Sequence, residues 1–177
     1  MKKLSIIIFV ALATFLSSFV GIYDAANNPG SITFTTDAGM KSDFKVGRWK
    51  FNQCDIKEDA IEKLQVEAEL DMSSLDCSWR ELEKNVKKKT DYFYIKKFPK
   101  ATLRVNGATK VKDNEYSAVA TLTLRDIARP VTLTFNTSKE GKTLKIKGIG
   151  TVNRRDHEFT GDGPKDLVPV SFEFEVQ

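Results

Sequence analysis

The sequence is poor in the side chains that carry most enzyme chemistry. Its 177 residues include one histidine, His157, and two cysteines, Cys54 and Cys77. It contains neither a G-x-S-x-G nucleophile motif nor a glycine-rich phosphate-binding loop. A catalytic triad would have to use His157, and a metal site would need ligands that converge from distant segments. We therefore expect no enzymatic activity, no cofactor and no metal, and we expect His157 in a polar surface turn.

An excess of charge of one sign is also missing from most of the chain. Residues 1–21 place two lysines before an uncharged apolar run from Leu4 to Val20, the layout of a secretory signal peptide. That run lies near the lower length limit for a spanning helix, which leaves an uncleaved anchor as the alternative. We predict a signal peptide over residues 1–21, or as far as Ala25, and a periplasmic or secreted protein. Without Lys2 and Lys3, 26 basic face 24 acidic side chains, a balance that does not favour nucleic-acid binding.

The two cysteines give no redox motif. No Cys-x-x-Cys pair is present, so thiol catalysis is not expected. An exported protein would meet an oxidising compartment, in which Cys54 and Cys77 could form a disulfide. Bridging requires Cα atoms within about 7 Å of each other, a distance that depends on the fold. A disulfide and two free thiols therefore both stay open.

What the sequence does contain is alternation of apolar and polar residues. The clearest case is residues 64–72, where five apolar side chains alternate with Gln, Glu, Glu and Asp. This pattern predicts an antiparallel strand with one wet face. Further strands are predicted at residues 31–36, 101–107, 116–124, 131–137, 142–152 and 168–176. No repeat or Pro-rich linker divides the chain, so residues 22–177 should form one domain of about eight strands.

Three local features add detail to this pattern. Residues 78–89 predict the one helix, with Ser78 and Glu81 as a capping box and a lysine-rich, solvated C-terminal end. Gly47 stands where the apolar parity switches, which predicts a bulge or a sharp bend. Residues 122–135 predict a β-hairpin whose link is the hexapeptide 125–130. The apolar face of that hairpin must pack against either another part of the sheet or a ligand.

Several segments, in this order, resemble the YceI-like family of exported polyisoprenoid-binding proteins. They are SITF (31–34), GRWKF (47–51), SSLD (73–76), DYFYIKKFPKATL (91–103) and TLTLRDIARPVTLTF (121–135). The resemblance implies an all-β, antiparallel eight-stranded lipocalin-like barrel with one short helix, which holds a long isoprenoid chain, such as a quinone tail, in its lumen. The chain departs from the family pattern at Asp126 or Ile127, where a glycine is usual, and at Arg129, where a lysine is common.

We predict that inward apolar side chains and neighbouring aromatic rings line this lumen. The predicted ligand-binding residues are Phe34, Trp49, Phe51, Val66, Ala68, Leu70, Met72, Phe93, Phe98, Leu103, Ala118, Ala120, Leu122, Leu133, Phe135, Phe172 and Phe174. An eight-stranded barrel is just wide enough to be filled by side chains or to hold one slim ligand. Small residues among large ones either leave a channel or let the large ones interdigitate, so an open lumen and a filled core both remain.

At the mouth of the barrel, arginines could contact a quinone or pyrophosphate headgroup. The candidates are Arg125, Arg129, Arg154 and Arg155, with solvated loop arginines as the alternative. The predicted function is lipid binding for transport, storage or sequestration. The partners would be an isoprenoid lipid or quinone, with transient membrane contact and a homodimer as further candidates.

Two other functions remain open from the sequence. One is a filled barrel that acts as an envelope protein–protein interaction module, without a lipid ligand. The other is a lipid hydrolase or isomerase, which would need His157 at the barrel mouth.

Overall fold

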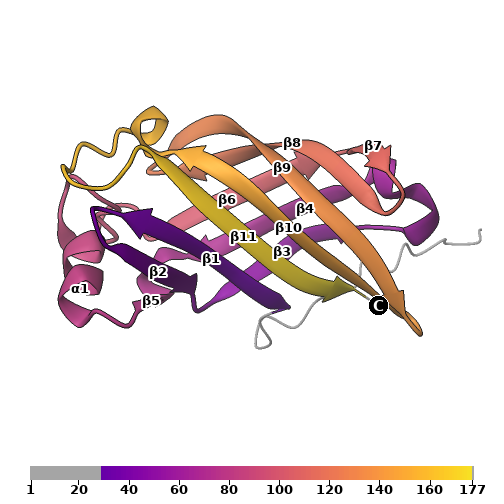
Figure 1. Cartoon of the computed structure of the whole chain (residues 1–177), viewed down its shortest axis with the longest axis horizontal. Helices are drawn as coiled ribbons and strands as arrows, with labels where there is room; N and C mark the ends of the chain where they lie inside the picture. The colour runs from indigo at the N-terminus through magenta and orange to yellow at the C-terminus, as the bar shows by residue number, and fades with distance from the viewer. Residues whose placement is uncertain (1–28, 177) are drawn as a thin grey trace, which may run out of the picture.

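The computed structural model describes residues 29–176, so the predicted signal peptide lies outside the described residues. Within them, eleven strands form one sheet (Figure 1). The strands are β1 (Gly30–Asp37), β2 (Lys41–Val46), β3 (Trp49–Asp55), β4 (Gln65–Asp71), β5 (Leu75–Cys77), β6 (Lys100–Asn106), β7 (Thr109–Lys112), β8 (Glu115–Leu124), β9 (Ile127–Glu140), β10 (Thr143–Asn153) and β11 (Leu167–Val176). The helices are α1 (Arg80–Lys88) and the 3-10 helices η1 (Glu58–Lys63), η2 (Met72–Ser74) and η3 (Arg154–His157).

The sheet is antiparallel throughout and curls around one core. Its strand order is β3-β4-β6-β8-β9-β10-β11-β1-β2-β5, and β7 pairs with β8. The predicted all-β antiparallel class with one α-helix is confirmed, but there are more strands than the eight predicted. Strands β5 and β7 have only three and four residues, too few for alternation to reveal them. The connection between β2 and β3 is bonded to the connection between β4 and β5. The backbone N–H of Gly47 donates to the Ser74 carbonyl, and that of Asp71 donates to the Arg48 carbonyl, at 3.0 Å each.

Strand β4 shows why the alternation works as a guide. Val66, Ala68 and Leu70 are buried in the core, as predicted. On the opposite face, Glu67 accepts a hydrogen bond from Arg104 at 2.8 Å, and Glu69 pairs with Lys100 at 3.0 Å. Successive side chains of a strand point to opposite faces, so the charged ones reach water while the apolar ones meet the core.

Gly47 marks a bend between β2 and β3 rather than a bulge within one strand. A Cβ there would lie 2.7 Å from the carbonyl oxygen of Ser74, so no larger residue fits without a shift. The register shift in this part of the sheet lies instead between Phe51 and Gln53, where β3 pairs with β4. Of the two predicted alternatives at Gly47, the structure adopts the bend.

The hairpin link is shorter than predicted. Strand β8 ends at Leu124 and β9 begins at Ile127, so only Arg125 and Asp126 form the turn. Their φ angles are 52° and 62°. Two positive φ angles are typical of a type I′ turn, whose twist matches that of the flanking strands. Residues 127–130 therefore pair with residues 121–124, although a proline is uncommon in the interior of a strand.

Helix α1 begins without the predicted capping box. Its N-cap is Trp79, and no side chain caps it. The carboxylate of Glu83 instead accepts a hydrogen bond from the backbone N–H of Cys77 at 3.3 Å and one from Lys87 at 2.7 Å. The bond from Lys87 is the main reason that the pKa of Glu83 lies below its usual range. The predicted pair was wrong: the N-cap is Trp79 rather than Ser78, and it is Glu83 rather than Glu81 that bonds back to the chain before the helix, at Cys77 of β5.

Both cysteines are free thiols. Cys77 is buried on β5, and Cys54 is partly buried on β3. Burial, with the neighbouring Asp55 carboxylate, raises the pKa of the Cys54 thiol to about 12. A thiol with such a pKa stays protonated at neutral pH and is a poor nucleophile.

The contact between α1 and the sheet yields a stability prediction. Phe44 is fully buried, stacks on Phe34 with ring centroids 5.0 Å apart and clusters with Cys77 and Val86. Replacing Phe44 with alanine should lower the free energy of unfolding by about 3–5 kcal/mol, measured by urea denaturation, because it leaves a cavity. Val119→Thr, at an outward side chain that is 67% exposed, should change it by less than about 0.5 kcal/mol. Equal effects of the two substitutions would contradict this packing.

Candidate functional site

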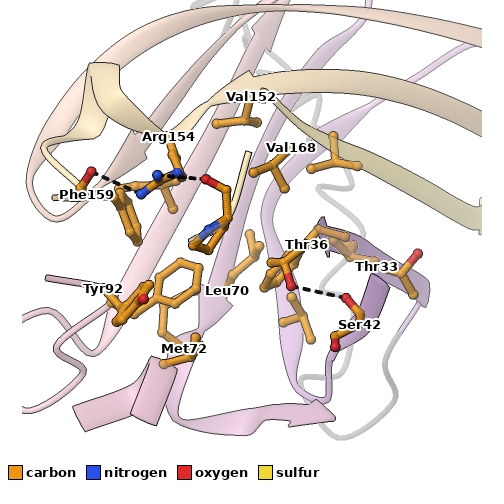
Figure 2. Close-up of a pocket in the computed structure, with 18 of the residues that line it drawn as sticks. Thr33, Thr36, Ser42, Leu70, Met72, Tyr92, Val152, Arg154, Phe159 and Val168 are labelled. Carbon is orange, nitrogen blue, oxygen red and sulfur yellow. Dashed lines mark hydrogen bonds between the residues drawn. The ribbon is translucent and has the colours of Figure 1, made fainter. Parts of the chain in front are cut away.

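A cavity of about 390 Å³ opens inside the curled sheet, at the end near α1. We call it the wide chamber. Figure 2 shows side chains from the strands and from the segments around Tyr92 and Phe159 that surround it. Apolar side chains from β1, β8, β9, β10 and β11 form part of its wall, because the inward parity of those strands is apolar, and α1 and irregular segments contribute others. The volume lies within the range of about 300–1,000 Å³ that small-molecule sites occupy.

A second cavity of about 60 Å³ lies deeper in the sheet. We call it the narrow chamber. Its wall includes an aromatic cluster in which Trp49, Phe51 and Phe174 meet edge to face, with centroids 5.1–6.2 Å apart. Such arrangements are the favourable geometry for aromatic pairs and hold the wall rigid. The two chambers share part of their lining, so together they extend along one interior.

The structure places most predicted ligand-binding residues on these walls. Those on the wide chamber are Phe34, Leu70, Met72, Phe93 and Leu122. Those on the narrow chamber are Trp49, Phe51, Val66, Ala68, Ala118, Phe135 and Phe174. Those on both are Leu103, Leu133 and Phe172.

Two predicted residues lie on neither wall. Ala120 is fully buried in the core, where the side chains are packed against one another. Phe98 lies beneath the guanidinium of Arg125, 5.5 Å from its ring centroid, and contacts Tyr94. Phe98 stands between two lysines and Pro99 in a segment without regular structure, so no strand alternation indicated the direction of its side chain.

Sequence reasoning missed two groups of lining residues. Val152, Val168 and Val170 share the inward parity of their strands, and extending the alternation would have found them. Tyr92 and Phe159 come from irregular segments and are brought to the wall by tertiary contacts, including an edge-to-face contact between Phe159 and Phe93 at 5.0 Å. No sequence pattern could have found this second group.

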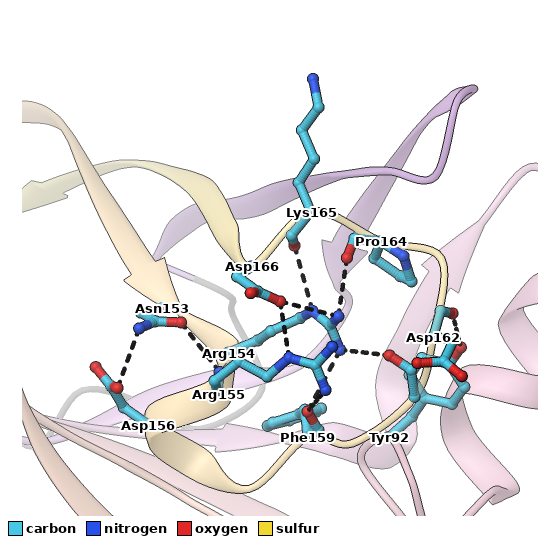
Figure 3. Close-up of polar contacts among 11 residues, drawn as sticks. Tyr92, Asn153, Arg154, Arg155, Asp156, Phe159, Asp162, Pro164, Lys165 and Asp166 are labelled. Carbon is cyan, nitrogen blue, oxygen red and sulfur yellow. Dashed lines mark hydrogen bonds and ion pairs between the residues drawn. The ribbon is translucent and has the colours of Figure 1, made fainter.

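Arg154 lines the wide chamber but is fully committed to the protein. Its guanidinium donates to the carbonyl oxygens of Gly161 (2.7 Å), Pro164 (2.8 Å) and Lys165 (3.2 Å), with a longer bond to Phe159 (3.4 Å). It also pairs with the Asp166 carboxylate at 3.0 Å. Figure 3 shows the segment wrapped around this side chain. Since a guanidinium has five N–H donors, this conformation leaves none for a headgroup.

The other three predicted headgroup arginines do not converge on the wide chamber. Arg155 donates to Asp166 at 2.8 Å and to the Phe159 carbonyl at 3.0 Å. Arg125 donates to the Glu158 carbonyl at 2.6 Å and covers the ring of Phe159. Arg129 is exposed and lines a groove elsewhere on the molecule. The structure thus places Arg154 alone of the four on the chamber wall.

The expectation of a surface histidine was wrong. His157 is 1% exposed, and its Nδ1–H donates to the Ile127 carbonyl at 3.0 Å. It does not line the wide chamber. Arg154 and His157 are both buried at the two ends of η3, because residues three apart on a 3-10 helix lie on one face. Arg155 and Asp156, which lie between them, are exposed. Their charges led to the prediction of a polar surface turn.

Other chemistry is sparse in the described part of the chain. Across residues 29–176, no group of three His, Cys, Asp or Glu side chains is placed to hold a metal ion. Over the same residues, no helix is long and apolar enough to cross a membrane.

The Arg154 network yields a second stability prediction. Arg154→Lys should lower the free energy of unfolding by at least about 1.5–3 kcal/mol, the contribution of one hydrogen bond to a charged group, because an ammonium cannot reach all these carbonyls. It should also expose residues 159–166 to proteolysis. Arg155→Lys, at a side chain that is 41% exposed, is the matched control and should cost under about 1 kcal/mol. A larger loss for Arg155 than for Arg154 would contradict the network.

Burial of His157 predicts a pH dependence of stability. Desolvation lowers the pKa of His157 below its ordinary value, against opposing effects of the Ile127 hydrogen bond and the Asp156 charge. Between this lowered pKa and the unfolded value of about 6.5, the unfolded chain binds more protons, so stability falls as pH drops below about 6.5. Urea denaturation at pH values from about 7 to 5 should show this fall, and His157→Gln should reduce it. Equal slopes in both proteins would disprove the assignment.

Comparisons with known proteins bear on the family. A model of the YceI-like domain matches residues 23–177. A UPF0312 protein of Yersinia enterocolitica is 29% identical over 130 residues, which cover 69% of this chain and 62% of that relative. The match thus spans less than two thirds of the relative's own length.

Solved structures share the fold. BcnA of Burkholderia cenocepacia superposes with a TM-score of 0.76 at 18% identity, covering 87% of this chain and 99% of that one. A polyisoprenoid binding domain from Saccharophagus degradans gives a TM-score of 0.61 at 12% identity, covering 82% and 92%. The family match over residues 23–177 confirms the resemblance drawn from the sequence motifs. The chain belongs to the YceI-like family.

Proposed function

We propose that the protein binds the hydrophobic tail of an isoprenoid lipid in the wide chamber, without catalysis. The observation that carries this proposal is a cavity of about 390 Å³ whose wall is mostly apolar. A preformed apolar cavity with few polar groups is the usual form of a small-molecule site. The Saccharophagus degradans neighbour, described as a polyisoprenoid binding domain, supports the ligand class.

Hydrophobic burial alone can hold such a tail. Each methylene group removed from water contributes about 0.8 kcal/mol, so a tail in the chamber needs no specific polar contact. The absence of a catalytic motif from the sequence therefore does not count against a binding function. The hydrolase or isomerase alternative needs His157 at the barrel mouth, and His157 is buried and does not line the wide chamber.

The polar groups on the wall favour a neutral headgroup such as a quinone. Thr36, Ser42 and Asp162 are among the polar residues that line the wide chamber, and the Thr36 hydroxyl donates to the Ser42 carbonyl at 3.4 Å. The only cationic side chain among the described lining residues is Arg154, whose donors are occupied. A pyrophosphate would bring charge to a wall that offers no free cation, and unpaired charges in apolar surroundings are costly.

For the cellular role, we propose export to the periplasm or beyond, followed by transport, storage or sequestration of the lipid. The support is the lysine-led apolar run at residues 1–21. A ligand with an apolar tail must be shielded from water wherever it crosses an aqueous compartment.

Mass spectrometry of an organic extract tests the binding function directly. Protein expressed in its exported form and purified without detergent should carry a prenyl lipid or quinone. Val168→Glu places a carboxylate on the wide chamber and should abolish retention, because burying it beside the tail is unfavourable. Leu167→Glu is the matched control, since its side chain is 64% exposed on the other face of β11, and it should retain the lipid.

The outcome also separates this function from its rival. Lipid retained equally by the two folded variants would remove the chamber as the binding site. A clean extract from the unmodified protein, repeated after incubation with candidate prenyl lipids, would instead favour an envelope interaction module.

A further inference from the structure

Four side chains separate the two chambers while lining both. They are Ile32 on β1, Leu103 on β6, Leu133 on β9 and Phe172 on β11. We call this group the partition. Strand β6 lies four places from β11 in the sheet order, so the partition draws residues from well-separated parts of the curled sheet. A tail that enters from the wide chamber must pass between these side chains to reach the aromatic cluster beyond.

Phe172 is held in this position by a glycine beside it. In the sheet, Phe172 pairs with Gly148 on one side and with Ile32 on the other. A Cβ built on Gly148 would lie 2.3 Å from the tip of the Phe172 ring, so the ring occupies the space that a side chain would otherwise fill. Aromatic rings that cover a cross-strand glycine are a known stabilising arrangement in sheets. The ring also packs near Phe174, with centroids 6.2 Å apart.

The other side of the ring faces open space. Phe172 is only partly buried although it points into the interior, and it lines both cavities. It therefore has firm packing on the sheet side and room on the lumen side. Leu133 also lies against a glycine, since a Cβ on Gly150 would be 2.7 Å from its Cδ2, but the ring of Phe172 makes the closer approach, at 2.3 Å from a Cβ on Gly148.

The two volumes show what the partition does. The wide chamber, at about 390 Å³, is large enough for a small-molecule ligand. The narrow chamber, at about 60 Å³, is far below that size and cannot take a long tail as it stands.

We propose that Phe172, seated against Gly148, is the residue that sets tail length. The preferred ligand is a single short apolar tail that ends at the partition. This inference rests on the proposed lipid-binding function and specifies it. Removing the ring joins the chambers and lets a longer tail reach the aromatic cluster around Trp49.

The two tryptophans allow a direct test, since Trp79 lies on the wide chamber and Trp49 on the narrow one. In a Trp79→Phe background, Trp49 is the only tryptophan and reports on the narrow chamber. The probes are straight-chain primary alcohols that carry bromine on the terminal carbon, because bromine quenches tryptophan fluorescence on contact. Calorimetry gives the affinity of each probe, and fluorescence shows whether its tail passes the partition.

In the Trp79→Phe protein, affinity should rise about fourfold with each added methylene and then level off at the length that meets Phe172. Trp49 should stay unquenched at every length. Adding Phe172→Ala should move the plateau to longer probes, tighten the longest ones by about tenfold or more, and quench Trp49. Phe172→Leu keeps a branched apolar side chain, so it should shift the plateau in the same direction with a smaller loss of stability.

Val170→Ala is the matched control. Val170 is the preceding inward residue on β11 and lines the wide chamber only, so its removal should leave Trp49 unquenched. Identical length dependence and quenching with and without the Phe172 ring would overturn the proposal while leaving lumen binding intact. Binding of no probe by any folded variant would overturn both this proposal and lipid binding itself.

Discussion

The curl of one sheet around its own apolar face is the constraint on which the other features depend. In the strands from β3 to β5 of the sheet order, the alternate side chains that point inward are mostly apolar. Apolar side chains therefore gather in one interior, and charged ones pair on the outer face. Such an interior is filled only where side chains from opposite walls can touch. At the deep end, aromatic rings meet and leave about 60 Å³, whereas near α1 the walls stand apart and leave about 390 Å³.

One buried guanidinium organises the rim of that larger space. The segment from Phe159 to Asp166 has no regular structure, so its carbonyl groups lack the ladder partners that strands provide. Arg154 donates hydrogen bonds to these carbonyl groups, including that of Phe159. The Phe159 ring is thereby positioned to pack against Phe93 on the chamber wall. The same bonds remove the guanidinium from ligand recognition. A residue that looks like a headgroup contact thus becomes a positioning element for an apolar wall.

Small residues have a specific role in this interior. Gly148 has no side chain, so the ring of Phe172 can lie against β10 and form part of the partition between the chambers. A Cβ in its place would contact the ring at 2.3 Å and also crowd the backbone of Thr134. The shape of the interior therefore depends on cross-strand pairs as much as on the hydrophobicity of its lining.

From the sequence alone came the fold class and the inward direction of the strand residues, because a strand has a period of two and its apolar parity shows which face is inside. Leu70, Leu122 and Phe174 are buried with the apolar parity of their strands, whereas β5 and β7 are too short to alternate and were not predicted. The roles of Arg154 and His157, the free thiols and the side chains from irregular segments followed only from tertiary structure. Arg154 and His157 are fixed by hydrogen bonds to carbonyl groups of other segments. The spacing of residues in the sequence does not show which carbonyl group a side chain will contact.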